Sequence, residues 1–127
     1  MNRDNFFKLL GPLMPKCDLR PIILESLDCG KYILEKVEYN VEPEERIMAY
    51  ILLPKKRKLK TPVVFCHHQH SSNYNRAKSE VIGLTGDPDL AYARELAENG
   101  FIPFAPDAVA FEDSNWHRES WWGTEYF

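Results

Sequence analysis

The sequence predicts a single α/β domain in which an antiparallel β-hairpin leads into a parallel βαβ unit. Apolar and polar residues alternate over residues 31–41, as in a half-buried strand, and residues 47–53 form the expected hairpin partner. Residues 63–66 and 101–105 are short apolar runs typical of buried strands, and a predicted helix over residues 88–99 separates them. A strand–helix–strand order of this kind makes the two strands parallel, with a right-handed crossover.

Composition and charge narrow the class of protein. The chain has 127 residues, 16 Lys and Arg against 19 Asp and Glu, and a formal charge of −3. Such values are typical of one soluble globular domain, and a mildly acidic chain is not expected to bind nucleic acid. No apolar run approaches the about 18 residues that cross a bilayer, and the first segment, interrupted by Lys8 and Pro12, does not resemble a signal peptide. Three widely spaced cysteines favour a reducing compartment, so we expect a cytoplasmic protein without a membrane partner.

Residues 1–30 are expected to form an N-terminal helical segment. Apolar residues crowd its first half in a pattern that fits a short amphipathic helix, and Gly11 and Pro12 predict that the helix ends there. We expect this helix to lie across the edge of the core. A helix bound at a membrane surface is the alternative, which the small number of basic residues disfavours.

The sheet and the first crossover helix are expected within residues 31–113. In the first strand, one parity is predicted to face the core, and its members are Ile33, Val37, Tyr39 and Val41. Residues 42–45 are expected to form the hairpin turn, and Pro54 to end the second strand. Five of the six residues at 55–60 are basic. We interpret this run as a solvated connection between strands, with a phosphate-binding or nuclear-import cluster as the alternative.

The crossover helix has clear end signals. Asp87 is a suitable N-cap, Pro88 suits the first helical position, and Gly100 suits the C-terminal cap. The spacing of its apolar residues predicts a buried stripe formed by Leu90, Ala93, Leu96 and Ala97.

The connection from residue 66 to residue 87 is the strongest functional signal. Such connections typically have about 2–6 residues, and longer ones are often functional. This one leaves the carboxyl end of a central strand, where open α/β sheets bind ligands, and it begins with His67, His68, Gln69 and His70. A metal site built from His67, His70 and Asp107 is one interpretation. The other is a turn whose backbone N–H groups stabilise an oxyanion.

Several segments resemble the α/β-hydrolases, and in particular the branch similar to dienelactone hydrolase. The strand and loop VVFCHHQH at 63–70 look like the strand and oxyanion loop of that family. The stretches KSEVIGLTGDP at 78–88 and AYARELAENGF at 91–101, followed by APD at 105–107, resemble the dienelactone-hydrolase-like branch. The resemblance covers roughly residues 31–113. It implies hydrolysis of a small-molecule carboxylic ester or lactone through a serine acyl-enzyme, with oxyanion donors in the backbone of His68, Gln69 and His70.

The chain departs from the family pattern in two ways. Histidines and Gln69 stand where glycines are common, and no G-x-S-x-G is present, so the nucleophile, acid and histidine of a triad are missing. We therefore expect an apparently truncated N-terminal portion of an α/β-hydrolase domain that is inactive on its own and needs no cofactor or metal. The tail at 114–127 is rich in aromatic residues, which we expect to pack in a complete fold or to promote self-association. Asp107, Glu112 and Asp113 are expected to order their loop.

Two further interpretations stay open at this point. One is a non-catalytic half-domain that folds on a partner through the aromatic tail. The other is the histidine-based metal-binding module described above, for which the sequence offers no second pair of ligands.

Overall fold

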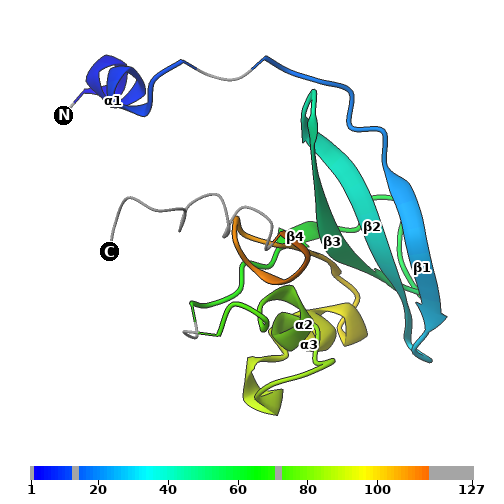
Figure 1. Cartoon of the computed structure of the whole chain (residues 1–127). Helices are drawn as coiled ribbons and strands as arrows, with labels where there is room; N and C mark the ends of the chain where they lie inside the picture. Colours follow the sequence, from blue (N-terminus) through cyan, green and yellow to red (C-terminus); the bar gives the residue numbers. More distant parts are fainter. Residues whose placement is uncertain (1, 13–14, 71–72, 115–127) are drawn as a thin grey trace.

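The computed structural model describes residues 2–12, 15–70 and 73–114 (Figure 1). The aromatic tail that the sequence singles out lies outside these residues, except for its first residue, Ser114. In chain order the elements are α1 (Arg3–Leu10), β1 (Ile22–Asp28), β2 (Tyr32–Glu42), β3 (Glu45–Pro54), β4 (Val63–Phe65), α2 (Lys78–Val81), the 3₁₀ turn η1 (Pro88–Leu90), α3 (Tyr92–Glu98), β5 (Ile102–Pro106) and the 3₁₀ turn η2 (Glu112–Ser114). No helix among the described residues is long and apolar enough to cross a membrane.

Five strands form one mixed sheet in the order β1-β2-β3-β5-β4. The predicted hairpin is confirmed, since β2 and β3 pair antiparallel with Val37 opposite Ala49. The predicted parallel pairing is also confirmed, since β4 pairs parallel with β5 and Val64 lies opposite Pro103. The prediction of a buried central strand at residues 63–66 is wrong for the described sheet, because β4 lies at its edge with Val63 and Phe65 exposed. The antiparallel pairing of β3 with β5 joins the two parts, so that three of the four strand pairs are antiparallel.

The N-terminal segment differs from the helical segment predicted for residues 1–30. Helix α1 is present, capped by the Asn2 side chain and by Gly11, but it buries none of its side chains and therefore does not lie across the core. Residues 22–28 form the strand β1, which pairs antiparallel with β2. The reason is that a β2 edge without β1 would leave backbone N–H and C=O groups unpaired, and the isoleucines at 22 and 23 favour an extended chain.

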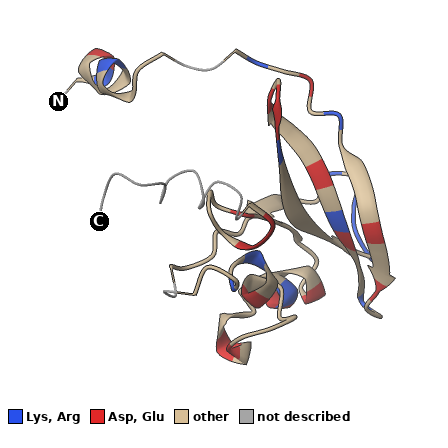
Figure 2. Cartoon of the chain, viewed as in Figure 1, with Lys and Arg blue, Asp and Glu red and all other residues tan. Residues whose placement is uncertain are grey.

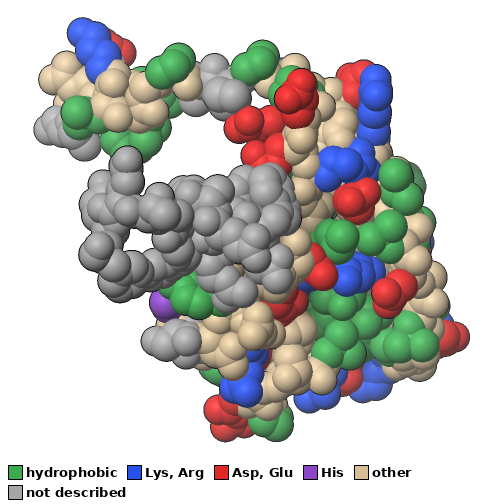
Figure 3. Space-filling model, viewed as in Figure 1, with side chains coloured by type: hydrophobic (Ala, Val, Ile, Leu, Met, Phe, Trp, Pro, Cys, Tyr) green, Lys and Arg blue, Asp and Glu red, His purple; other side chains and the backbone are tan. Residues whose placement is uncertain are grey.

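Strand β1 adds an apolar surface to the edge of the sheet. All of its residues are exposed, including four large apolar side chains, and Figure 3 shows hydrophobic side chains on the surface at the β1 side of the molecule. The four are Ile22, Ile23, Leu24 and Leu27.

The basic run at 55–60 is exposed throughout and forms the connection between β3 and β4, as expected for a solvated segment (Figure 2).

The hydrophobic core lies between the sheet and the helices α2 and α3. Leu52 on β3 is fully buried, and the predicted helix stripe is confirmed most clearly at Ala93 and Ala97, which are almost completely buried. The predicted parity of β2 is correct only in part. Val37 is buried, but Tyr32 and Leu34, on the opposite parity, belong to the main core cluster. Both faces of β2 are partly covered, so alternation alone does not identify the helix-covered face.

The predicted N-cap of the crossover helix, Asp87, precedes a separate 3₁₀ turn, and the α-helix begins about one turn later. The Asp87 carboxylate caps the N-terminus by accepting from the N–H of Asp89, but the turn that it caps is η1, and α3 begins only at Tyr92. Together, β4, α2, α3 and β5 place the segments that follow β4 and β5 at the same end of the sheet.

Replacing Leu52 by Ala is expected to lower the free energy of unfolding by about 2–5 kcal/mol, because it leaves a cavity in the core. The matched control is Leu59→Ala, since Leu59 is fully exposed and its removal should change the stability by less than about 0.5 kcal/mol. Urea denaturation of the two variants measures the difference. Equal stability of both variants would contradict the core described here.

Candidate functional site

Two loops converge at the carboxyl end of the parallel strand pair. The first, which follows β4, contains His67, His68 and Gln69, and the second comprises residues 107–113 after β5. The N–H of Glu112 donates to the carbonyl oxygen of Tyr74 at 2.8 Å, which joins the second loop to the later part of the first. This is the edge of the sheet at which the sequence predicts a ligand.

Three hydrogen bonds fix the start of the first loop. The carbonyl oxygen of His67 accepts from the hydroxyl of Tyr92 at 2.7 Å. The ring Nε2 of His68 accepts from the N–H of Ala108 at 3.1 Å. The side-chain amide of Gln69 donates to Oε2 of Glu80 at 3.3 Å. Each of the three residues is thus bonded to a different structural element: helix α3, the second loop and helix α2.

The backbone N–H groups at the start of the first loop take no part in these hydrogen bonds. Within the part of the chain that the structure describes, no acceptor receives a hydrogen bond from the N–H of His67, His68 or Gln69. Of these three residues only His68 is buried, whereas His67 and Gln69 are exposed. A buried N–H group without an acceptor is rare in folded proteins and calls for a physical reason. Unpaired donors next to the end of a parallel strand are the arrangement that oxyanion stabilisation requires.

The bonding of His68 determines its protonation state. Only 4% of the residue is exposed, and burial lowers the pKa of its imidazole below the ordinary value of 6.5. Because Nε2 accepts from Ala108, the ring hydrogen is assigned to Nδ1, which lies 3.0 Å from the carbonyl oxygen of Gln69. His68 is therefore a neutral residue that orders the loop through both of its nitrogens.

An aromatic cluster packs beneath the same loops. The Phe111 ring lies 4.6 Å from the ring of His68, 5.4 Å from that of His70 and 4.9 Å from that of Tyr74, measured between centroids. Phe111 belongs to the second loop and the other three rings belong to the first. Apolar and ring contacts thus add to the hydrogen bonds between the loops.

The most buried charge in the described structure is the ammonium of Lys78. Its side chain has no solvent exposure, and Nζ lies 2.6 Å from Asp107, 2.9 Å from Glu112 and 2.7 Å from Asp113. Burial alone would lower the pKa of this amine, but the three carboxylates outweigh burial and raise it, so Lys78 is charged. A lysine on α2 thus binds three acids of the loop that follows β5.

The carboxylates differ in their own titration. Burial raises the pKa of Asp107 to about 7, against the attraction of Lys78, and its Oδ1 is buried without a hydrogen-bond partner. Burial also opposes ionisation of Glu112, but hydrogen bonds from Ser79 and Lys78 outweigh it, so the pKa of Glu112 is lowered. In the same way, hydrogen bonds from Lys78 and Lys36 lower the pKa of Asp113. Glu112 also accepts from the N–H groups of Ala77 and Ser79, which begins helix α2.

The structure does not bring together the residues of the alternative metal site that the sequence leaves open. Among the described residues, the one group of three ligand-bearing side chains close enough to hold an ion consists of Asp107, Glu112 and Asp113. These three already surround Lys78, and His67 and His70 do not belong to the group. The alternative metal site of His67, His70 and Asp107 is therefore not a group that the structure brings together, because the Asp107 carboxylate binds the buried lysine.

Sequence reasoning missed Lys78 and Glu80. Both lie on α2, a single helical turn, and both are buried although they are charged. The available signal was a lysine placed after the long loop, with three acids following the next strand, but nothing in the linear pattern indicates that these residues meet.

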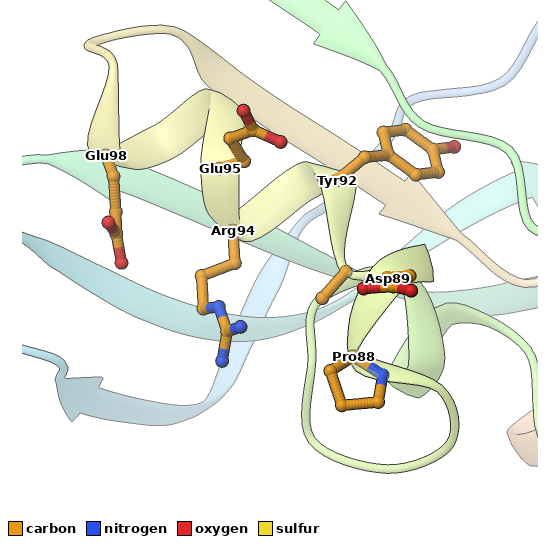
Figure 4. A pocket seen from close by; sticks show the side chains of 7 residues that line it. Pro88, Asp89, Tyr92, Arg94, Glu95 and Glu98 are labelled. Atoms are coloured by element: carbon orange, nitrogen blue, oxygen red, sulfur yellow. The ribbon is translucent and has the colours of Figure 1, made fainter.

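A separate hollow lies on the outer side of α3. It has a volume of about 430 Å³ and is lined by Pro88, Asp89, Ala91, Tyr92, Arg94, Glu95 and Glu98. Tyr92 and Arg94 extend from α3 in different directions, and the lining contains no histidine, serine or cysteine (Figure 4). Tyr92 belongs to both regions, since its hydroxyl reaches the carbonyl oxygen of His67.

Comparison with known proteins gives consistent matches. A model of an abhydrolase family matches residues 12–126. The protein named "Putative hydrolase YtaP" from Bacillus subtilis is 33% identical over 122 residues, which are 93% of this chain and 40% of that protein. A crystal structure from Bacteroides fragilis, described as a "putative acetyl xylan esterase", is similar with a TM-score of 0.70 and 20% identity. The similar region comprises 88% of this chain and 30% of the chain in that crystal structure. This likeness shows that the two chains share a fold over the region.

The ring of His68 is expected to titrate with a pKa below 6.5 and to carry its hydrogen on Nδ1. Because the unfolded chain takes up this proton more readily than the folded chain, His68 contributes stability that is lost as pH falls below about 6.5. Nitrogen-15 NMR of the imidazole rings measures both the pKa and the tautomer. A pKa at or above 6.5, or a hydrogen on Nε2, would contradict the contact with Ala108.

Proposed function

The chain belongs to an abhydrolase family, and on that premise we propose that it is the N-terminal portion of a serine-dependent ester hydrolase of the dienelactone-hydrolase-like branch. The substrate class is a small-molecule carboxylic ester or lactone. Two similarities support the proposal: one relative is named a hydrolase, and a protein of similar fold is described as an esterase. The chain spans 40% and 30% of these two proteins, which leaves room in the intact protein for the triad that this chain lacks.

The single observation that carries this proposal concerns the backbone N–H groups of His68 and Gln69, which follow β4. We assign the oxyanion role to the backbone of His68, Gln69 and His70. The N–H groups of His68 and Gln69 donate to no acceptor in the described part of the chain. The side chains of both residues are held by hydrogen bonds, His68 by Ala108 and Gln69 by Glu80. Fixed donors of this kind stabilise the charge that develops on a carbonyl oxygen during acyl transfer.

The proposed reaction follows from this arrangement. A serine hydroxyl of the intact protein attacks the ester carbonyl while a histidine takes its proton, and the carbonyl oxygen becomes an oxyanion near the backbone of His68 and Gln69. Collapse of this intermediate expels the alcohol, which receives the proton, and leaves an acyl-enzyme. Water then releases the carboxylic acid by the same steps and restores the serine.

The edge of the sheet supports the idea of a larger domain. Strand β4 is the last strand of the described sheet, and Val63 and Phe65 on it are 66% and 61% exposed. Exposed apolar side chains on a short strand with one neighbour favour further pairing. We propose that the remainder of the intact domain packs against this edge, and that the chain alone self-associates through it.

In the intact protein, Gln69→Pro is expected to lower kcat by about 10²–10³, because proline removes one oxyanion donor. Gln69→Ala is the matched control, since it removes the bond to Glu80 but keeps the N–H, and it should cost less. His67→Gln and His70→Gln should also cost less than Gln69→Pro. Turnover of an activated aryl ester measures all four variants.

Two results would contradict the proposal. One is a harmless Gln69→Pro, and the other is saturable ester turnover by the 127-residue chain alone, which serves as the blank because it contains no G-x-S-x-G.

A further inference from the structure

We propose that Lys78 is a positioning residue for the oxyanion loop: its buried ammonium closes a ring of contacts that sets the orientation of His68 and Gln69. The inference rests on the proposed function and extends it, because it assigns a role in the same site to Lys78, which lies on α2, eight positions after His70. It is carried by the geometry of the ring and by the complete burial of the charge.

The ring consists of three contacts and three short stretches of backbone. Lys78 Nζ binds Asp107 Oδ2 at 2.6 Å, and the next residue along the chain donates its N–H to His68. Gln69 follows His68 and donates to Glu80, which lies on α2 with Lys78. The members of this Lys78 ring are Lys78, Asp107, Ala108, His68, Gln69 and Glu80. Two of the three proposed oxyanion donors, the backbone N–H groups of His68 and Gln69, therefore lie on one side of the ring, and Lys78 lies on the other.

The contact made by Lys78 is the strongest of the three. It joins two charges without solvent exposure, whereas the contacts of His68 and Gln69 are longer hydrogen bonds at 3.1 and 3.3 Å. The pair also joins segments that are distant in the sequence, since Lys78 lies on α2 and Asp107 follows β5, 29 residues later. Without this pair, Glu112 and Asp113 would still bind the loop to α2, but the residue directly before Ala108 would no longer be bound to that helix.

Removing the ammonium would also change the charge balance. Asp107, Glu112 and Asp113 present oxygen atoms within 4.8 Å of one another, and Lys78 lies between them. In its absence Lys36, which is 3.0 Å from Asp113, is the remaining cation bound to the cluster. The three carboxylates would then repel each other, and the loop that holds Ala108 would move away from His68.

The test uses the intact protein with Lys78→Met and, as the matched control, Lys36→Met. Lys36 also binds Asp113 but lies on β2 and belongs to neither loop, so its removal takes the same charge from the cluster without opening the ring. We expect Lys78→Met to lower kcat by about 10²-fold with KM changed by less than about threefold, as for the loss of an oxyanion donor. Lys36→Met should leave kcat within about threefold.

A second variant covers the case in which Lys78→Met does not fold. The double variant Lys78→Met with Asp107→Leu removes both members of the buried pair, so that no unpaired partner of that pair remains. It opens the ring in the same way, so kcat should again fall by about 10²-fold. A folded double variant with the kcat of the unaltered protein would overturn the inference.

A readout that does not need activity separates this inference from the proposed function. Backbone order parameters of His68 and Gln69 should decrease in the double variant and stay unchanged in Lys36→Met. If the unaltered intact protein hydrolyses no ester while these order parameters decrease, the proposed function fails and the positioning role of Lys78 stands. If the order parameters do not change, or if both variants lower kcat equally, the positioning role is wrong.

Discussion

A buried ammonium constrains the rest of this structure. Lys78 has no contact with solvent, and a charge in that position is tolerated only when carboxylates surround it. Three acids from the loop after β5 meet that requirement, and in doing so they bring the loop against α2 and against the segment after β4. The two loops therefore meet because the buried ammonium of Lys78 requires carboxylates around it. The same ion pairs place His68 and Gln69.

Local patterns in the sequence predict the sheet and the crossover well. The alternation over residues 31–41 and the apolar runs near 63 and 102 correspond to β2, β4 and β5, and Ala93 and Ala97 face the core as the helical spacing predicts. Strand β1 escaped prediction because all seven residues are exposed, so neither face carries a burial signal. Its pairing depends on the free edge of β2, which exists only in the folded sheet.

At the site too, the sequence predicts which loop is involved but not which residues from distant parts of the chain contact it. The position and length of the loop after β4 lead to the prediction of His68, Gln69 and His70 as site residues, because ligand sites follow the carboxyl ends of parallel strands, and this stays a prediction. The way these residues are bonded was not predictable. Lys78 meets Asp107, Glu112 and Asp113 across separations of 29, 34 and 35 residues. The sequence predicts that Asp107, Glu112 and Asp113 order their loop, but it does not indicate that they do so by binding a lysine.

The most direct test of this account is a crystal structure of the intact protein with a boronic acid or phosphonate that mimics the tetrahedral intermediate. We predict that the oxygen standing for the oxyanion lies about 2.7–3.1 Å from the backbone nitrogen of His68, Gln69 or His70, with the contacts of the Lys78 ring intact. An oxyanion bound by donors from elsewhere, with the loop after β4 turned away from it, would contradict the central claim.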